Sequence, residues 1–153
     1  EMGLRERARF QEGDLTATGL PGSSCDAVMS LDVLVFVPDK AAALSEIARI
    51  LRPGGCFAFT TWEQPGFSER LGAAQLTDYK PLLTSEGFQV ETYEEPLNWR
   101  LQQQKVCEGI VASEPELREE MGSEVAARYV AMARGSLADL PFRRYVFGVA
   151  KRL

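Results

Sequence analysis

Two acidic residues near strand-like runs are the first that could contact a ligand. Asp14 comes directly after Gly13, where a short charged run ends, and Asp32 lies within the longer apolar run 25–37. Asp14 suits a ligand pocket and a simple turn equally well, so both interpretations stay open. Asp32 is better interpreted as a local cap or a solvated loop residue.

The chain contains no histidine, which removes the commonest general base and the commonest metal ligand. Its three cysteines, Cys25, Cys56 and Cys107, lie far apart and form no CxxC pair. We therefore expect no disulfide framework and no metal site. This cysteine usage is typical of a reducing compartment, which predicts a cytoplasmic protein.

The composition is that of an ordinary globular domain, with 153 residues, 45% hydrophobic and 25% charged. A net charge of −5 offers no electrostatic surface for a phosphate backbone, so nucleic acid is not an expected partner. No apolar run reaches the roughly 18 residues of a membrane span, so a membrane is not expected either. The composition predicts no particular oligomeric state.

The first part of the chain alternates between expected strands and an expected helix. Residues 7–12 predict a strand, and the nearly continuous apolar run 25–37 predicts a buried strand whose second half turns out over the end of the sheet. Asp39 is the expected N-cap of a helix over 40–51, with Glu46 on its polar side. "LRPGG" then ends that helix, with two glycines expected at positive φ before a strand over 56–62.

The second part of the chain contains more helix. The pattern predicts a helix over 77–86, a strand over 88–95, two or three amphipathic helices within 97–140 and a strand over 143–153. Strands that alternate with helices in this way predict an α/β doubly wound sheet, here with a helical insertion before the last strand.

In order and spacing, the sequence resembles the class I S-adenosylmethionine-dependent methyltransferases. More narrowly it resembles methyltransferase type 11, the small-molecule group related to ubiquinone and menaquinone biosynthesis. The resemblance covers most of the chain and rests on the segments "FQEGDLTATGLP", "CDAVMSLDVLVFVPD", "ALSEIARILRPGGCFAFTTW", "LLTSEGFQVETYEE" and "RRYVFGVAKR".

The resemblance implies a Rossmann-like sheet in the strand order three-two-one-four-five-seven-six, with the seventh strand antiparallel. Residues 7–12 would be strand three, and the first two strands have no counterpart in the sequence. The expected organisation is therefore a partial Rossmann-like core over 1–96, a helical insertion or lid over 97–140 and the final antiparallel strand over 141–153.

The resemblance also implies S-adenosyl-L-methionine as cofactor. Asp14 would accept a hydrogen bond from the adenine amino group, and Leu15 would offer a backbone amide and an apolar edge to the ring. Ser30 and Leu31 would line the methionine and ribose part. A small molecule would be the methyl acceptor, with Trp62, Trp99 and Arg100 as candidate residues of its wall. Trp99 equally suits plain core packing.

Some features depart from the family pattern. The glycine-rich first loop and the acidic residue that ends the second strand have no match, and the chain starts at Glu1 without a methionine. We therefore expect that this chain is N-terminally truncated and inactive by itself. Residues 1–10 would be the tail of a helix that leads into a strand. The fourth strand would then expose an apolar edge.

The family often has a histidine where this chain has Val35 and Phe36. Asp32, Glu63, Tyr79 or a water would then have to serve as any base, and no catalytic residue is assigned.

The leading hypothesis is methyl transfer to a small-molecule acceptor by this cofactor. The alternative is a non-catalytic, methyltransferase-like domain that binds a partner protein, which the missing loop and missing histidine would also fit. Half of an NAD-dependent dehydrogenase shares the sheet class but fits the motif order less well.

Overall fold

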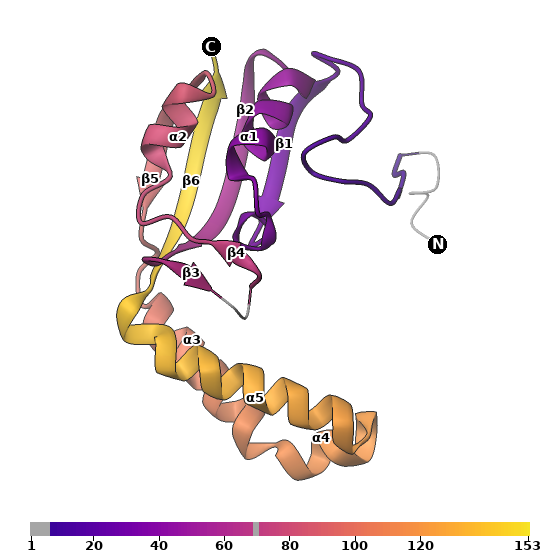
Figure 1. Ribbon diagram of the computed structural model, residues 1–153, viewed down its shortest axis with the longest axis vertical. Coiled ribbons are helices and arrows are strands. Elements are labelled where there is room, and N and C mark those ends of the chain that lie inside the picture. Colours follow the sequence, from indigo (N-terminus) through magenta and orange to yellow (C-terminus); the bar gives the residue numbers. More distant parts are fainter. Residues whose placement is uncertain (1–6, 69–70) are drawn as a thin grey trace.

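A computed structural model describes residues 7–68 and 71–153. It contains one twisted sheet of four strands in the order β1-β2-β6-β5, with helices on its face and at one end (Figure 1). β1 and β2 are parallel, and β6 is antiparallel to both of its neighbours. The strands are β1 Cys25–Leu31, β2 Leu51–Glu63, β5 Phe88–Glu94 and β6 Arg144–Arg152. This order confirms the four-five-seven-six part of the expected Rossmann-like sheet.

The helices form two groups. Two helices lie against the sheet, and three others form an arm that extends from the end of the sheet where β1 and β2 finish (Figure 1). A short hairpin, β3 Phe67–Ser68 and β4 Ala73–Ala74, lies at the same end. The helices are α1 Lys40–Ile50, α2 Lys80–Ser85, α3 Trp99–Ala112, α4 Glu114–Met121 and α5 Ser123–Asp139.

The core lies between the sheet and its two covering helices. Leu44 and Ile47 of α1 are fully buried in the same cluster as Phe57 and Phe59 of β2, whose rings stack with centroids 4.9 Å apart. Leu83 of α2 belongs to this cluster too. The predicted amphipathic character of α1 is therefore confirmed, because the apolar stripe of the helix faces the sheet.

The run 25–37 divides as expected. β1 ends at Leu31 and a short 3-10 helix, Leu34–Phe36, follows over the end of the sheet. The carboxylate of Asp39 then accepts a hydrogen bond of 2.9 Å from the backbone amide of Ala42. Asp39 is therefore the N-cap of α1, as predicted.

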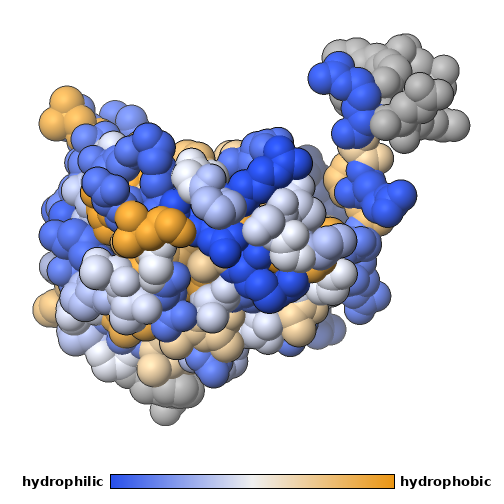
Figure 2. Space-filling model, turned by 90° about the horizontal axis from the view of Figure 1, so that it is seen from above, coloured by the Kyte–Doolittle hydropathy of each residue, from blue (hydrophilic) through white to orange (hydrophobic). Residues whose placement is uncertain are grey.

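Residues 7–12 do not form a strand, so that prediction is wrong. Phe10 is 94% exposed, and the segment extends away from the sheet (Figures 1 and 2). A strand needs a hydrogen-bonding neighbour, and within the described ranges residues 7–12 pair with no strand; the nearest bridge, between Asp14 and Ala17, lies beyond the segment. The helix tail expected near residues 1–6 lies outside the described residues.

Two further expectations need correction at the start of β2 and in α1. β2 already begins at Leu51, and only Gly54 of the two glycines has positive φ. Gly55 is required for space, because a Cβ there would lie 2.8 Å from the carbonyl oxygen of Arg52. Glu46 is buried rather than on a solvated face.

The outer edge of β1 has no neighbouring strand among residues 7–68 and 71–153. Met29 and Leu31 on this strand are 71% and 59% exposed. Unpaired strand edges are places where other chains can add.

Candidate functional site

A cavity of about 120 Å³ lies where β1 and β2 end and the helical arm begins. Its wall combines apolar, aromatic, amide and charged side chains from both sides of that junction. They are Asp32, Val35, Phe36, Trp62, Gln64, Leu71, Gln103, Ser136 and Arg143.

Asp32 occupies a strained position on this wall. Its φ is +56°, in the left-handed region that non-glycine residues rarely adopt. Its backbone amide donates to the carbonyl oxygen of Thr60 at 3.1 Å, and the Thr60 hydroxyl donates to its Oδ1 at 2.9 Å. The Tyr145 hydroxyl donates to its Oδ2 at 3.2 Å. Residues of two strands, β2 and β6, thus fix one carboxylate at the end of β1.

An aromatic cluster supports the same wall. Trp62 of β2 lies opposite Tyr145 in the β2–β6 ladder, with ring centroids 4.6 Å apart. Trp99 meets Trp62 edge-on at 5.3 Å. Burial raises the pKa of Tyr145 above its ordinary value, so its hydroxyl remains a hydrogen-bond donor at neutral pH.

Arg143 is the buried cation of the cavity wall, with 5% of its surface exposed. Its Nε donates to Gln64 Oε1 at 2.7 Å, and its Nη2 donates to the carboxylate of Asp139. The guanidinium also lies 5.6 Å from the centre of the Trp62 ring. Sequence reasoning missed Arg143 and Tyr145, since no local motif marks either residue.

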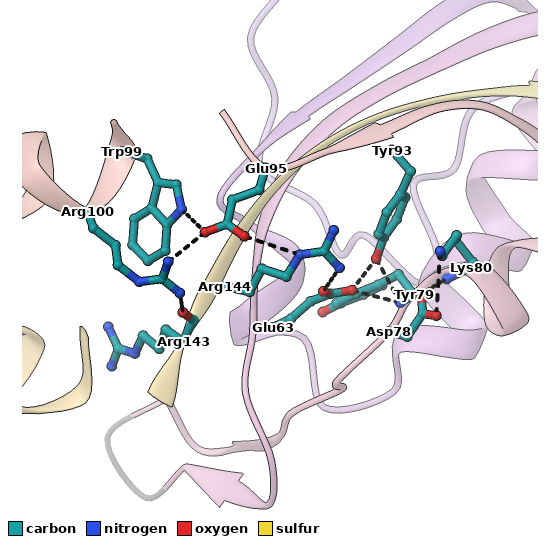
Figure 3. A network of polar contacts seen from close by, with 10 residues as sticks. All are labelled: Glu63, Asp78, Tyr79, Lys80, Tyr93, Glu95, Trp99, Arg100, Arg143 and Arg144. Carbon is teal, nitrogen blue, oxygen red and sulfur yellow. Dashed lines mark hydrogen bonds and ion pairs between the residues drawn. The ribbon is translucent and has the colours of Figure 1, made fainter. Parts of the chain in front are cut away.

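Of the three predicted acceptor residues, Trp62 lines the cavity, whereas Trp99 and Arg100 do not. Figure 3 shows both of the latter directed to Glu95: the Trp99 indole donates to its Oε1, and Arg100 Nη1 donates to the same oxygen at 2.9 Å. Arg100 also donates to the backbone oxygen of Arg143 at 2.8 Å. These contacts hold the start of α3 against β6.

The Glu63 carboxylate, one of the candidate bases, is occupied in a structural network that also includes the backbone amide of Tyr79, another candidate (Figure 3). The Glu63 carboxylate is 2% exposed and accepts from the Tyr93 hydroxyl, from the Tyr79 backbone amide at 3.1 Å and from Arg144 at 3.1 Å. Burial raises the pKa of Tyr79 to about 12. Neither side chain lines the cavity, so Asp32 is the candidate base that lies on its wall.

The predicted cofactor residues form two separate pairs. Asp14 is exposed and accepts from the Thr16 backbone amide and the Thr16 hydroxyl, each at 2.8 Å, and these bonds hold its pKa below the ordinary value. Leu15 packs against the core. Among the described residues no hydrogen bond joins this pair to Ser30 or Leu31.

Ser30 and Leu31 end β1 in contrasting environments. Ser30 is buried, and its hydroxyl has no hydrogen-bond partner within the described ranges, whereas Leu31 is exposed. A buried hydroxyl without a partner is uncommon and suits a place where a ligand supplies the missing contact.

Glu46 connects the loop after Asp14 to α1. Its Oε1 accepts from the Thr18 backbone amide at 2.9 Å and from the Thr18 hydroxyl at 2.6 Å. Arg49 donates to the same carboxylate, and these two partners lower the pKa of Glu46 to about 2. No local pattern predicts this contact, because Thr18 and Glu46 lie 28 residues apart in the chain.

Comparison with known proteins finds similarity to methyltransferases over part of the chain. Residues 2–59 match the family model described as a methyltransferase domain. A probable S-adenosylmethionine-dependent methyltransferase of Mycolicibacterium smegmatis is 35% identical over 97 residues, which are 56% of this chain and 37% of that protein. A dimethylglycine N-methyltransferase of Parasynechococcus marenigrum is 33% identical over 60 residues, which are 39% of this chain and 21% of that protein. The chain thus spans little more than a third of these relatives at most.

Solved structures show the same fold at low identity. The [4+2]-cyclase SpnF superposes with a TM-score of 0.81 at 20% identity, over 98% of this chain and 57% of its own. A Haemonchus contortus phosphoethanolamine N-methyltransferase in complex with S-adenosylhomocysteine superposes with a TM-score of 0.74 at 18% identity. The match covers 91% of this chain and 36% of that protein. Together with the sheet order, these matches support the resemblance to class I S-adenosylmethionine-dependent methyltransferases and S-adenosyl-L-methionine as the cofactor.

Proposed function

We propose that this chain is part of an enzyme that transfers a methyl group from S-adenosyl-L-methionine to a small-molecule acceptor. The observation that carries the proposal is the cavity at the carboxyl ends of β1 and β2, directly after Ser30 and Leu31. Ligands of open α/β sheets bind in this position. The acceptor would enter the cavity, and Trp62 would form part of its wall.

Asp14, Leu15, Ser30 and Leu31 are the residues proposed to hold the cofactor. The buried Ser30 hydroxyl lacks a partner among the described residues, and Asp14 Oδ2 accepts no described hydrogen bond, so both atoms suit a polar ligand. When bound, S-adenosyl-L-methionine supplies a methyl group on a sulfonium with a good leaving group.

The chain's own residues would mainly position the acceptor and exclude water, which can supply much of the acceleration in a displacement of this kind. α3 and α5 contribute Gln103 and Ser136 to the cavity wall, so the helices of 97–140 would act as its lid. No helix in the described ranges has the length and apolar character needed to cross a bilayer.

Calorimetric titration with S-adenosylhomocysteine tests this proposal. We expect binding to a version of the protein extended upstream through a glycine-rich loop, and weak or absent binding and turnover for the 153-residue chain alone. A matched Asp14→Ala variant of the extended protein should bind more weakly. Absence of binding to a folded extended version would contradict the proposal.

A non-catalytic domain that binds a protein partner is the second candidate. The unpaired edge of β1, with exposed Met29 and Leu31, favours it. The fold likeness to a protein titled a cyclase also shows that this fold by itself does not specify methyl transfer. Folded protein that fails to bind S-adenosylhomocysteine in both forms would support this candidate.

A further inference from the structure

The carboxylate of Asp32 is held in place at a conformational cost. A non-glycine residue in a sparsely populated backbone region costs on the order of 1–3 kcal/mol and persists where the surroundings determine it. Here Thr60 fixes both the backbone amide and Oδ1, and Tyr145 fixes Oδ2. The result is a carboxylate with a defined orientation on the cavity wall.

The described partners of this carboxylate are neutral. Thr60 and Tyr145 donate through hydroxyl groups, and no ion pair of Asp32 exists among residues 7–68 and 71–153. The cation on the same wall, Arg143, donates to the carboxylate of Asp139 and to Gln64 instead. Asp32 therefore offers the cavity a negative charge that no described side chain neutralises.

Aromatic side chains line the cavity together with this charge. Trp62 and Phe36 both belong to its wall, and Trp62 is held by its contact with Tyr145. A carboxylate beside aromatic faces is an arrangement that recognises ammonium groups, through a charge-assisted hydrogen bond and cation–π attraction. The volume of about 120 Å³ suits a small ligand.

We propose that this cavity binds the ammonium group of a small primary or secondary amine, with Asp32 as the anchoring carboxylate. Thr60 and Tyr145 act as positioning residues, and Trp62 and Phe36 provide the aromatic surface. The inference rests on the proposed function, because it names the acceptor class of the same site. A neutral alcohol of the same carbon skeleton lacks the charge that this site selects.

Two probes of the same size test this selectivity. Propylammonium and propan-1-ol are titrated separately into the 153-residue chain, and binding is followed by NMR on the two indole N–H signals, since the only tryptophans are Trp62 and Trp99. We expect propylammonium to bind at least about tenfold more tightly than propan-1-ol. Equal affinity, or no binding of propylammonium, would overturn the proposal.

Variants assign the selectivity to Asp32. Asn tolerates the left-handed backbone region, so Asp32→Asn removes the charge while it keeps the local conformation. We expect this variant to bind propylammonium about tenfold more weakly. Asp26→Asn, at an exposed carboxylate of β1, should change the affinity less than about twofold. Unchanged affinity in Asp32→Asn would also overturn the proposal.

The titration needs no cofactor, so its outcome is separate from that of the proposed function. Selective amine binding without binding of S-adenosylhomocysteine to the extended protein would leave an amine site and remove the methyltransferase proposal. The reverse result would keep the methyltransferase proposal and exclude an amine as the group bound by Asp32.

Discussion

The acceptor side and the cofactor side of the proposed site are built differently. On the acceptor side, strand β2, the short 3-10 helix Leu34–Phe36 and helices α3 and α5 contribute side chains to one cavity, and the Asp32 carboxylate has two side-chain donors. On the cofactor side, Asp14 is exposed and its carboxylate is bonded, among the described residues, to the nearby Thr16 alone, and Leu31 is exposed as well. The acceptor side is thus preorganised within the described chain, whereas the cofactor side consists of two short stretches that share no hydrogen bond.

This difference predicts which changes alter the fold and which alter only binding. Side chains that several elements hold in place are costly to change, because their neighbours cannot relax independently. Substitution of an exposed residue with only local contacts usually changes the free energy of unfolding very little. Substitutions on the two sides should therefore separate stability effects from ligand effects.

The largest effect is expected at the pairing of β2 with β6, on which the acceptor side depends. A Cβ at Gly148 would lie 2.3 Å from Phe59, its cross-strand partner, whose ring is buried and stacked on Phe57. We expect Gly148→Val to lower the free energy of unfolding by about 3 kcal/mol, measured by denaturant titration. Gly135→Ala is the matched control, since no atom lies within 4 Å of the added Cβ. It should be neutral or slightly stabilising.

The buried network around Glu63 should give the next largest effect. Glu63→Gln keeps the size of the side chain but removes the charge that Arg144 and the Tyr93 hydroxyl contact. We expect a loss of about 2 kcal/mol of unfolding free energy, because charge-assisted bonds to a buried group are lost. The exposed pair Asp26–Arg52 provides the control, and Asp26→Asn should change stability by less than about 1 kcal/mol. Equal losses in both variants would contradict the network's role.

Glu46 should make the cofactor side sensitive to acid. Its pKa is lowered to about 2 by Arg49 and Thr18, so its stabilising contribution is present above its ordinary value of 4.5 and is lost as the pH falls toward about 2. We expect Glu46→Gln to abolish about 1 kcal/mol of this pH-dependent stability. Denaturant titrations of both proteins between these pH values measure the difference. The exposed Glu124→Gln should leave the profile unchanged, and an unchanged profile in Glu46→Gln would contradict the assignment.

The smallest effect on stability is expected at Asp14. Asn can form the same turn with Thr16, so Asp14→Asn should change the free energy of unfolding by less than about 0.5 kcal/mol. Its binding of S-adenosylhomocysteine in the extended protein should nevertheless weaken, since a carboxylate accepts from an amino group more strongly than an amide. A stability loss as large as that of Glu63→Gln would show that Asp14 is structural instead.

The sequence predicted the features that depend on local chemistry or on an ordered set of motifs. The N-cap Asp39 and the apolar stripe of α1 were correct, because capping and helical periodicity involve residues close in the chain. The resemblance to the methyltransferases correctly predicted the order of the four strands. The prediction of a strand over residues 7–12 was wrong, because a strand also needs a hydrogen-bonding neighbour, which the local sequence does not contain.

By itself, then, the sequence determined the fold class, the resemblance to methyltransferases and the bounds of α1 and α2 to within a few residues. Only the tertiary structure decided that Trp62, rather than Trp99 or Arg100, lines the cavity, and that Asp32 is held by Tyr145, 113 residues away in the chain. It also paired Arg143 with Gln64 across 79 residues. Such contacts follow from the register of neighbouring strands and the packing of distant elements, which local propensities do not contain.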